Sequence, residues 1–326
     1  MPSALPLGSR SPAARGHEPV LADEVVRLLA PRAGETVVDC TFGAGGHARR
    51  LAPSLGEGGR YIAIDRDPEA RAWFDEFADD VVCEARFVHG NFADVLPRLA
   101  EQGLRADVVL MDLGLSSMQV DQPERGFSYS RQAPLDMRMD SGHGPSAADL
   151  VADASEADLA RLMRDLGEER YARPIAKAIV RRRASEAITT TGDLVDVVRS
   201  AVPTPALFAG GHPAKRVFQA LRIAVNDELG SLERGLTAAF GLLEPDGRLG
   251  VISFHSLEDR MVKRFMRDRT QGCICPPDMP VCGCGRTAEG ALLAAKAQRP
   301  KQAELDRNPR ARSALLRGVR RLDGDA

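Results

Sequence analysis

An apolar run that breaks into a glycine-rich loop, VVDCTFGAGGH over Val37–His47, limits the possible folds of this chain more than any other segment. This pattern predicts a buried strand that turns into a helix, with backbone amides and the helix N-terminus facing a ligand. A second apolar run, YIAID, ends at Asp65, twenty residues beyond Gly45. A carboxylate at the end of the neighbouring strand can accept both hydroxyls of a ribose. The two segments together predict an adenosine-containing cofactor.

The glycine spacing alone fits two kinds of cofactor. Gly43, Gly45 and Ala48 match the dinucleotide pattern G-x-G-x-x-G/A. Asp39 precedes the loop, however, and Asp112 closes a later apolar run, ADVVLMD. A carboxylate pointing into the loop would repel a pyrophosphate and attract the ammonium and sulfonium groups of S-adenosylmethionine. Asp39 has a structural alternative, because Asp before a turn often bonds the loop backbone. We favour the methyl donor, with a nicotinamide-dependent dehydrogenase as the alternative.

The composition is typical of a globular protein with roughly two domains. The chain has 326 residues, of which 44% are hydrophobic and 28% charged, and this excludes the disordered and membrane classes. No apolar run approaches the ~20 residues that span a bilayer, and the opening segment lacks a signal core. We therefore expect a cytoplasmic protein without membrane contacts, preceded by a flexible tail at residues 1–16.

The overall charge excludes a protein that coats nucleic acid by bulk electrostatics. The net charge is −2 and the pI is near 6.3. Basic residues nevertheless outnumber acidic ones in two segments, 161–183 and 299–321. Each cluster has the alternative of a solvated helix face. Two of them on a nearly neutral chain favour a substrate that carries phosphate.

Strands and helices are predicted to alternate in the first part of the chain. Segments of helical length separate the apolar runs 36–41, 61–65, 85–89 and 106–112. This order predicts a doubly wound, Rossmann-like α/β sheet. A long helix at about 220–243, the run 248–253 and a last strand within 311–319 complete the prediction.

The middle of the chain lacks this alternation. Apolar residues recur three and four positions apart in 156–167, 170–185 and 191–202, which indicates helices. We predict an all-helical domain at 126–214, inserted into a sheet domain formed by 17–125 and 215–326. The insert should lie over the carboxyl ends of the strands, where ligands bind. Asp39, Asp65, Asp112 and His255 should line that crevice.

The order of motifs along the chain resembles one protein family. The segments are HEPVL, DCTFGAGGH, AIDRDP, HGNF, DLGLSS, ERGFS, PLDMRMD, FHSLEDR and NPRARS. They are similar to those of the RsmH (MraW) family, the S-adenosylmethionine-dependent methyltransferases that modify a cytosine N4 in 16S ribosomal RNA. The match covers about residues 17–320. The resemblance implies a Rossmann-like methyltransferase sheet and, as substrate, a cytidine in the decoding centre of the small ribosomal subunit.

The resemblance also implies roles for individual residues. Gly45, Gly46 and His47 would contact the methyl donor, and Asp65 would hold its ribose. Phe92 and Asp112 would flank the adenine and methionine portions, and Gln119 would complete the pocket.

The chemistry of the reaction suggests where a proton acceptor is needed. A cytosine amino group is a poor nucleophile because its lone pair is drawn into the ring, so the enzyme must hold acceptors near its hydrogens and align the nitrogen. Asp112 is the leading candidate; alternatively it holds the donor's ammonium group or the loop backbone. Many amino-group methyltransferases have D/N/S-P-P-Y/F at this strand end, whereas this chain has DLGLSS. The aromatic residue that stacks on the base is therefore unidentified.

Two further motifs supply candidate contacts to the substrate. In FHSLEDR, His255 could accept a proton and Arg260 could hold a phosphate, beside Ser256 and Asp259; a structural role for the histidine is the alternative. In PLDMRMD, Asp136 and Arg138 form either an ion pair that locks the insert or contacts to RNA.

The substrate should be a structured particle. A base inside a duplex is out of reach, so the cytidine must be single-stranded or flipped, and the RNA must be recognised largely by shape. An alternative from a different class is a non-catalytic RNA-binding assembly factor. The sequence leaves monomer and homodimer both open.

Four of the six cysteines occur in CICPPDMPVCGC. Two C-x-C pairs on a proline-stiffened turn could place four thiolates around a structural zinc ion, and disulfides are a poorer explanation in a reducing compartment. The other two, Cys40 and Cys83, are expected to be small core residues. The candidate zinc ligands are Cys273, Cys275, Cys282 and Cys284.

Overall fold

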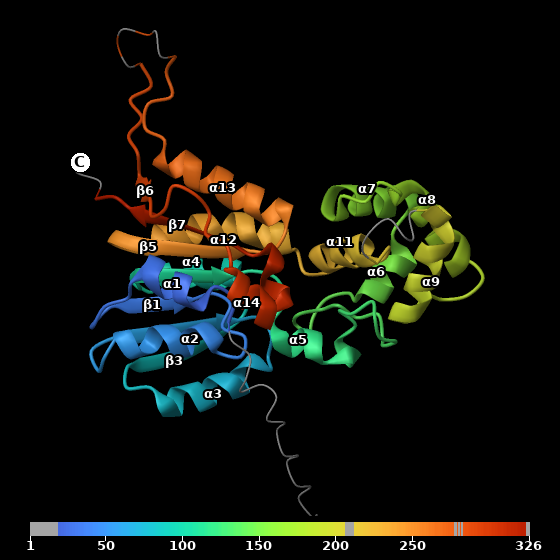
Figure 1. The fold of residues 1–326 in the computed structure, drawn as a ribbon, viewed down its shortest axis with the longest axis horizontal. Coiled ribbons are helices and arrows are strands. Elements are labelled where there is room, and N and C mark those ends of the chain that lie inside the picture. The colour runs from blue at the N-terminus through green and yellow to red at the C-terminus, as the bar shows by residue number, and fades with distance from the viewer. Residues whose placement is uncertain (1–18, 206–211, 277–278, 280, 282, 324–326) are drawn as a thin grey trace, which may run out of the picture.

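The computed structural model describes residues 19–205, 212–276, 279, 281 and 283–323, so the expected tail at 1–16 lies outside the described residues. These residues form a seven-stranded sheet in the order β3-β2-β1-β4-β5-β7-β6 (Figure 1). Strands β1 to β5 pair in parallel, and β7 is antiparallel to both of its neighbours. The doubly wound α/β class is confirmed. The strands are β1 (Thr36–Asp39), β2 (Arg60–Asp65), β3 (Glu84–His89), β4 (Ala106–Asp112), β5 (Leu243–Ser253), β6 (Gly290–Leu292) and β7 (Leu315–Arg321).

Helices cover both faces of the sheet because successive side chains of a strand point to opposite sides. Val37 belongs to one core with Leu29 and Phe77, and its neighbour Val38 belongs to another core with Leu96. The first layer contains α1 (Ala22–Leu29), α2 (Gly46–Leu51) and α3 (Ala70–Asp80). The second contains α4 (Phe92–Glu101), α12 (Glu228–Leu242) and α13 (Ser256–Thr270).

Between β4 and α12 the chain forms a group of helices with a third core, built from buried side chains between Phe127 and Leu221. Figure 1 shows this group at one end of the sheet. Ser146, Ser155 and Thr190 each accept a hydrogen bond from the backbone amide three residues on, which stabilises a helix start by about 1 kcal/mol. The helices of this region are α5 (Ser117–Asp121), α6 (Ala147–Asp153), α7 (Glu156–Gly167), α8 (Ala172–Arg183), α9 (Thr191–Ala201) and α11 (Lys215–Val225).

The long helix expected at about 220–243 is instead two helices, α11 and α12, separated by Asn226 and Asp227. Asp227 has a φ of 46°, a left-handed conformation that Asp and Asn tolerate better than most residues. Asn226 is buried, and its side-chain amide donates to the carbonyl of Met137 at 2.7 Å. This side chain therefore holds the chain at the break.

The boundary of the helical unit also differs from the sequence-based division. Residues 215–225 were expected in the sheet domain, but Val217 and Leu221 of α11 are buried in the helical core. We therefore propose that the helical unit extends from about 126 to about 225 rather than to 214.

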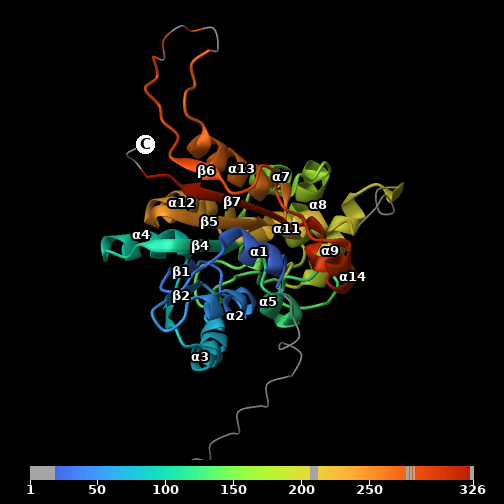
Figure 2. The ribbon, with the colours of Figure 1, turned by 60° about the vertical axis from the view of Figure 1, so that its left-hand side comes forward.

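Strands β7 and β6 form the edge of the sheet beyond β5. The short strand β6 was not expected, and β7 begins later than the segment 311–319 suggested. The described residues of 271–289, between α13 and β6, project away from the sheet in both views (Figures 1 and 2). None of the described helices is both long and apolar enough to cross a membrane. The short helices are η2 (Ala52–Ser54), η3 (Pro123–Arg125), α14 (Gln302–Arg307) and η4 (Pro309–Ser313).

Candidate active site

The parallel register decides which acidic side chains reach the carboxyl edge of the sheet. Asp39 on β1 is paired with Ala63 on β2 and with Leu110 on β4. Asp65 and Asp112 therefore each lie two residues further along their strands than Asp39. Ligands of open parallel sheets bind beyond this edge. Asp65 and Asp112 reach it, and Asp39 stops short of it.

A cavity of about 1470 Å³ lies at this edge. Its wall includes residues that follow each of the five parallel strands, and the helical unit contributes Met139. The volume exceeds the roughly 300–1,000 Å³ of a typical small-molecule site, which leaves room for two reactants. Of the residues expected to bind the cofactor, the wall contains Gly46, His47, Asp65, Phe92, Asp112 and Gln119.

Gly45 does not line the cavity, and its role is to shape the loop. It precedes α2 with a φ of 75°, in the left-handed region that favours glycine. A Cβ at this position would lie 2.8 Å from the ring of Phe42. The loop can close tightly over the strand end only without a side chain here.

The Asp65 carboxylate is held by backbone amides on both of its oxygens. Gly43 donates to Oδ2 at 2.7 Å and Asp67 donates to Oδ1 at 2.8 Å. Burial raises the pKa of Asp65 to about 6, although both amide bonds act to lower it. The carboxylate is therefore oriented by the loop, ionised near neutral pH, and exposed to the cavity.

Asp39 does not face the cavity, and the expectation that it lines the crevice is wrong. It is 1% exposed, and its oxygens accept bonds from the Thr41 amide at 3.1 Å and the Tyr61 hydroxyl at 2.9 Å. Burial raises the pKa of this carboxyl group. Asp39 therefore has the structural role, in which it bonds the backbone of the loop. It does not distinguish a pyrophosphate ligand from a sulfonium ligand.

Asp112 and His47 face each other across the cavity floor. Nε2 of His47 lies 3.4 Å from Oδ2 of Asp112. The Asp112 amide donates to the Thr41 hydroxyl at 2.7 Å, which ties the end of β4 to the end of β1. Both ring nitrogens of His47 and Oδ1 of Asp112 are buried without a hydrogen-bond partner in the described part of the chain. Buried polar atoms are rarely left unpaired, so these atoms point to a ligand.

Phe92 and Gln119 are positioned by neighbours on other elements. Phe92 begins α4 and lies against Gly235 of α12, where a Cβ would come within 2.3 Å of the ring. Gln119 is buried, and its amide donates to Asp67 at 2.9 Å and accepts from the Ser116 backbone at 3.2 Å. Gln119 therefore shapes the wall with its polar atoms already paired.

A buried ion pair that sequence reasoning missed joins the end of β2 to the helical unit. Nη2 of Arg125 donates to Oδ2 of Asp67 at 2.9 Å and to the carbonyl of Met139 at 2.8 Å. Both side chains are almost fully buried. The sequence did offer one sign of this pair, because Asp67 is a second acidic residue just after Asp65 at the end of β2. Its partner, 58 residues away, could not be read from the chain.

Comparison with known proteins supplies the family. The model of the MraW methylase family matches residues 14–322. The chain belongs to the MraW methylase family. A protein of Rubrobacter xylanophilus is 51% identical over 307 residues, covering 94% of this chain and 96% of its own length. One of Syntrophotalea carbinolica is 49% identical over 311 residues, covering 94% and 98%. Both are named ribosomal RNA small subunit methyltransferase H, and the resemblance found in the motifs is confirmed.

In this MraW methylase, His255 lies outside the cavity wall and begins helix α13. Its Nδ1 accepts a bond from the Glu258 amide at 3.4 Å, and its Nε2 lies 3.1 Å from Oε1 of Glu258. The other Glu258 oxygen accepts from the Phe254 amide at 2.8 Å. Burial raises the pKa of Glu258, but the bond to His255 and the nearby charges outweigh it and the pKa is lowered. The position of His255 fits a helix cap rather than a proton acceptor.

The polar residues after His255 bind protein groups. Ser256 donates to Oε2 of Glu168 at 2.8 Å, and Arg260 donates to Oε1 of the same carboxylate at 3.3 Å. Asp259 accepts two bonds from Arg317 of β7, at 2.7 and 3.1 Å. Glu168 ends α7. The motif thus fastens the helical unit and the last strand to α13, and these three residues are not part of the cavity wall.

Asp136 and Arg138 of PLDMRMD form an ion pair, which was one of the two alternatives for these residues. Two guanidinium nitrogens of Arg138 donate to the two oxygens of Asp136, each at 2.8 Å. Burial acts to raise the pKa of Asp136, but these bonds lower it overall. Neither residue lines the cavity. Of the two alternatives, an ion pair or contacts to RNA, the geometry is that of an ion pair within the helical unit.

Proposed function

We propose that this chain transfers a methyl group from S-adenosylmethionine to the N4 amino group of a cytidine in the decoding centre of 16S ribosomal RNA. Membership of a methylase family and relatives named for the small subunit RNA support the proposal. The observation that carries it is the pair of acidic strand ends, Asp65 and Asp112, beside one cavity.

The residues of the cavity fit the methyl donor. The amide of Gly43 donates to Asp65 at 2.7 Å, and Gly43 lines the cavity without a side chain of its own. Among the described residues, Oδ1 of Asp112 and the ring nitrogens of His47 have no hydrogen-bond partner. They can therefore bond polar atoms of the donor. We assign the ribose hydroxyls to Asp65, the methionine portion to Asp112 and His47, and the adenine to the Phe92 side of the cavity.

The bound donor supplies an electrophilic methyl group on a positively charged sulfur. Asp112 contributes a negative charge beside it, which favours binding of the cation. Oδ1 of Asp112 can accept a hydrogen from the cytosine amino group and hold the nitrogen in line. Nε2 of His47 lies 3.4 Å from the other carboxylate oxygen, so the two side chains would contact neighbouring parts of the same ligand. Asp112 is therefore our candidate for the catalytic residue.

Phe254 is our candidate for stacking on the cytosine. It lines the cavity directly after β5, and a Cβ at Gly114 would meet its ring at 3.5 Å. DLGLSS has no aromatic residue at the end of β4, and this ring follows the adjacent strand and lies beside Gly114 of that motif. Stacking of a base on an aromatic side chain contributes about 1–3 kcal/mol.

An exposed basic stripe on α8 supports binding of RNA phosphates. Arg173, Lys177 and Arg181 are exposed and spaced four apart, so they share one helix face. The second basic segment differs, because Arg317 bonds Asp259 and Arg321 bonds the Leu243 carbonyl. We therefore assign the RNA backbone to α8 and not to β7.

The decisive experiment gives the enzyme small ribosomal subunits that lack the modification, together with labelled S-adenosylmethionine. The label should appear on N4 of one cytosine after digestion to nucleosides. Label on protein, on DNA or on another position of the base would contradict the proposal. Subunit binding without methyl transfer would favour the assembly-factor alternative.

A simple binding test separates the methyl donor from a nicotinamide cofactor. Trp73 is the single tryptophan and lines the cavity. Its fluorescence should change with S-adenosylmethionine at concentrations where NADH has no effect. The reverse result would favour the dehydrogenase alternative.

A further inference from the structure

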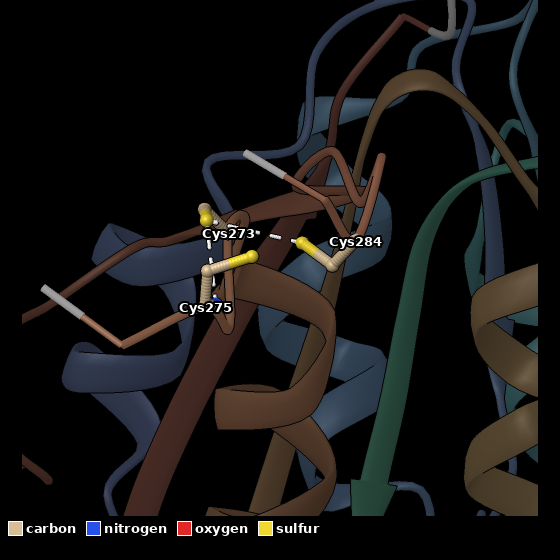
Figure 3. A group of neighbouring side chains, drawn as sticks. All are labelled: Cys273, Cys275 and Cys284. Carbon is tan, nitrogen blue, oxygen red and sulfur yellow. Dashed lines mark hydrogen bonds between the residues drawn. The ribbon is translucent and has the colours of Figure 1, made fainter. Parts of the chain in front are cut away.

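Three cysteine side chains gather on the segment 271–289, which we call the arm. The sulfur atoms of Cys273, Cys275 and Cys284 all lie within 4.8 Å of one another. Figure 3 shows the sulfurs of Cys275 and Cys284 pointing toward each other, with the sulfur of Cys273 beside them. Cys282, the fourth cysteine of the motif, lies outside the described residues.

The spacing of the sulfurs fits metal coordination. The sulfurs of Cys273 and Cys284 are 3.8 Å apart, whereas a disulfide would bring them to about 2.0 Å. Thiolates at about 2.3 Å from a tetrahedral zinc ion lie about 3.8 Å from one another. The observed separation is therefore that of two corners of a zinc–thiolate tetrahedron.

A backbone hydrogen bond in the arm ends on one of the three sulfur atoms. The amide of Cys275 donates to the sulfur of Cys273 at 3.4 Å. A neutral thiol sulfur is only a weak acceptor, and the same bond strengthens when the acceptor is ionised. The turn thus points a backbone donor at the sulfur of Cys273, where it can bond a metal-bound thiolate.

We propose that Cys273, Cys275 and Cys284 bind a zinc ion that holds the arm in its conformation. Each thiol loses its proton to solvent as a Zn–S bond forms, and no electrons are transferred. The soft thiolate set selects zinc over magnesium or calcium. Affinity should fall at low pH because the protons compete with the metal.

The arm needs such a tie because its described apolar side chains are largely exposed. Ile274 is 55% exposed and Val281 75% exposed. The base of the arm is held by the Glu289 amide, which donates to the Arg269 carbonyl at 2.9 Å. Beyond the base, metal binding would supply the free energy that a hydrophobic core supplies elsewhere.

The site is separate from the proposed chemistry. None of the described residues of the arm lines the cavity, and Figure 1 shows the arm at the end of the sheet away from the helical unit. The zinc is therefore structural, and its test is independent of the proposed function.

The test measures the metal content of the full-length chain, purified without chelator, by mass spectrometry. We expect one zinc per chain in the wild type and loss of at least nine-tenths of it in Cys273→Ser/Cys284→Ser. Ile274→Ser is the matched control, because it changes an exposed residue between two ligands and should keep the zinc. Cobalt exchanged into the wild type should show thiolate-to-cobalt charge-transfer absorption that is absent from the double variant.

Two results would overturn the inference. The first is a wild-type chain whose thiols are reduced and that takes up neither zinc nor cobalt. The second is a double variant that keeps its metal. A wild-type circular dichroism spectrum and a cooperative thermal unfolding transition in the double variant serve as the check that the sheet domain is folded, so that loss of metal cannot be ascribed to global unfolding.

Discussion

Gly43 and Asp65 are joined by a hydrogen bond of 2.7 Å from the glycine amide to the carboxylate. The Asp67 amide holds the second oxygen, so the carboxylate is fixed before a ligand arrives and loses little side-chain entropy on binding. We expect Asp65→Ala to weaken S-adenosylmethionine binding about 100-fold, since two hydrogen bonds to a charged group contribute about 1.5 kcal/mol each. Isothermal titration calorimetry measures this change directly.

The control for this experiment is Asp75→Ala. Asp75 is an exposed residue of α3 that pairs with Arg71 and lies outside the cavity wall. It should bind the donor as the wild type does. An Asp65→Ala variant with wild-type affinity would show that the ribose is held elsewhere.

The raised pKa of Asp65 predicts that donor binding depends on pH. Burial shifts this pKa from 3.8 to about 6, so the group is ionised above pH 6 and protonated below it. Only the carboxylate can accept hydrogen bonds from two ribose hydroxyls. Affinity should be constant above about pH 6 and fall about tenfold for each pH unit below it. In Asp65→Ala the dependence between about pH 5 and about pH 7 should vanish, and a dependence that persists would assign it to another group.

The sequence was sufficient for the fold class and for the two acidic strand ends. Alternating apolar runs located the first four strands, and an Asp at the end of a run marks the sheet edge. It was not sufficient for Asp39, because pairing register places this residue two positions below the edge, level with Ala63. The pairing of Asp39 with Ala63 and Leu110 depends on where three separate strands meet in space, which the run around Asp39 alone does not show.

The polar motifs were harder to interpret for a similar reason. Ser256 and Arg260 look like substrate contacts in the chain, yet both bind Glu168, which lies about ninety residues earlier. A hydroxyl or guanidinium has the same appearance in the sequence whether its partner is RNA or protein. Gly235, by contrast, carries no chemical signal at all, although its missing side chain is what admits the Phe92 ring.

Gly235→Ala tests the packing of Phe92. The added Cβ would lie 2.3 Å from the ring, so the ring must move and the adenine side of the cavity must change. We expect donor affinity to fall at least tenfold and thermal stability to fall by about 1–3 kcal/mol. Gly241→Ala on the same helix is the control, because nothing lies within 4 Å of its Cβ. That change should be neutral or stabilise by up to about 1 kcal/mol. Equal behaviour of the two variants would contradict the role of Gly235.

Arg125→Ala tests the buried link between the sheet and the helical unit. It removes the cationic partner of the buried Asp67 carboxylate and leaves Gln119 as its side-chain donor; breaking a buried ion pair typically costs about 3–5 kcal/mol. Chemical denaturation should reveal this loss. Arg71→Ala removes an exposed pair of similar length, 2.7 Å, and should cost less than about 1 kcal/mol. If both variants lost less than about 1 kcal/mol, the link would not be structural.

His255→Ala separates a helix cap from a proton acceptor. The ring accepts the Glu258 amide at the start of α13 and does not line the cavity. Removing it should lower the free energy of unfolding by about 1 kcal/mol and leave turnover per folded molecule within about twofold. His255→Asn should restore most of the stability, because Asn caps helices well but cannot take up a proton near neutral pH. The two variants therefore give opposite answers for the two roles: a cap is rescued by Asn, whereas a proton acceptor is lost in both. A fall in turnover of a hundredfold or more in both variants, with donor affinity unchanged, would show that His255 takes part in the reaction.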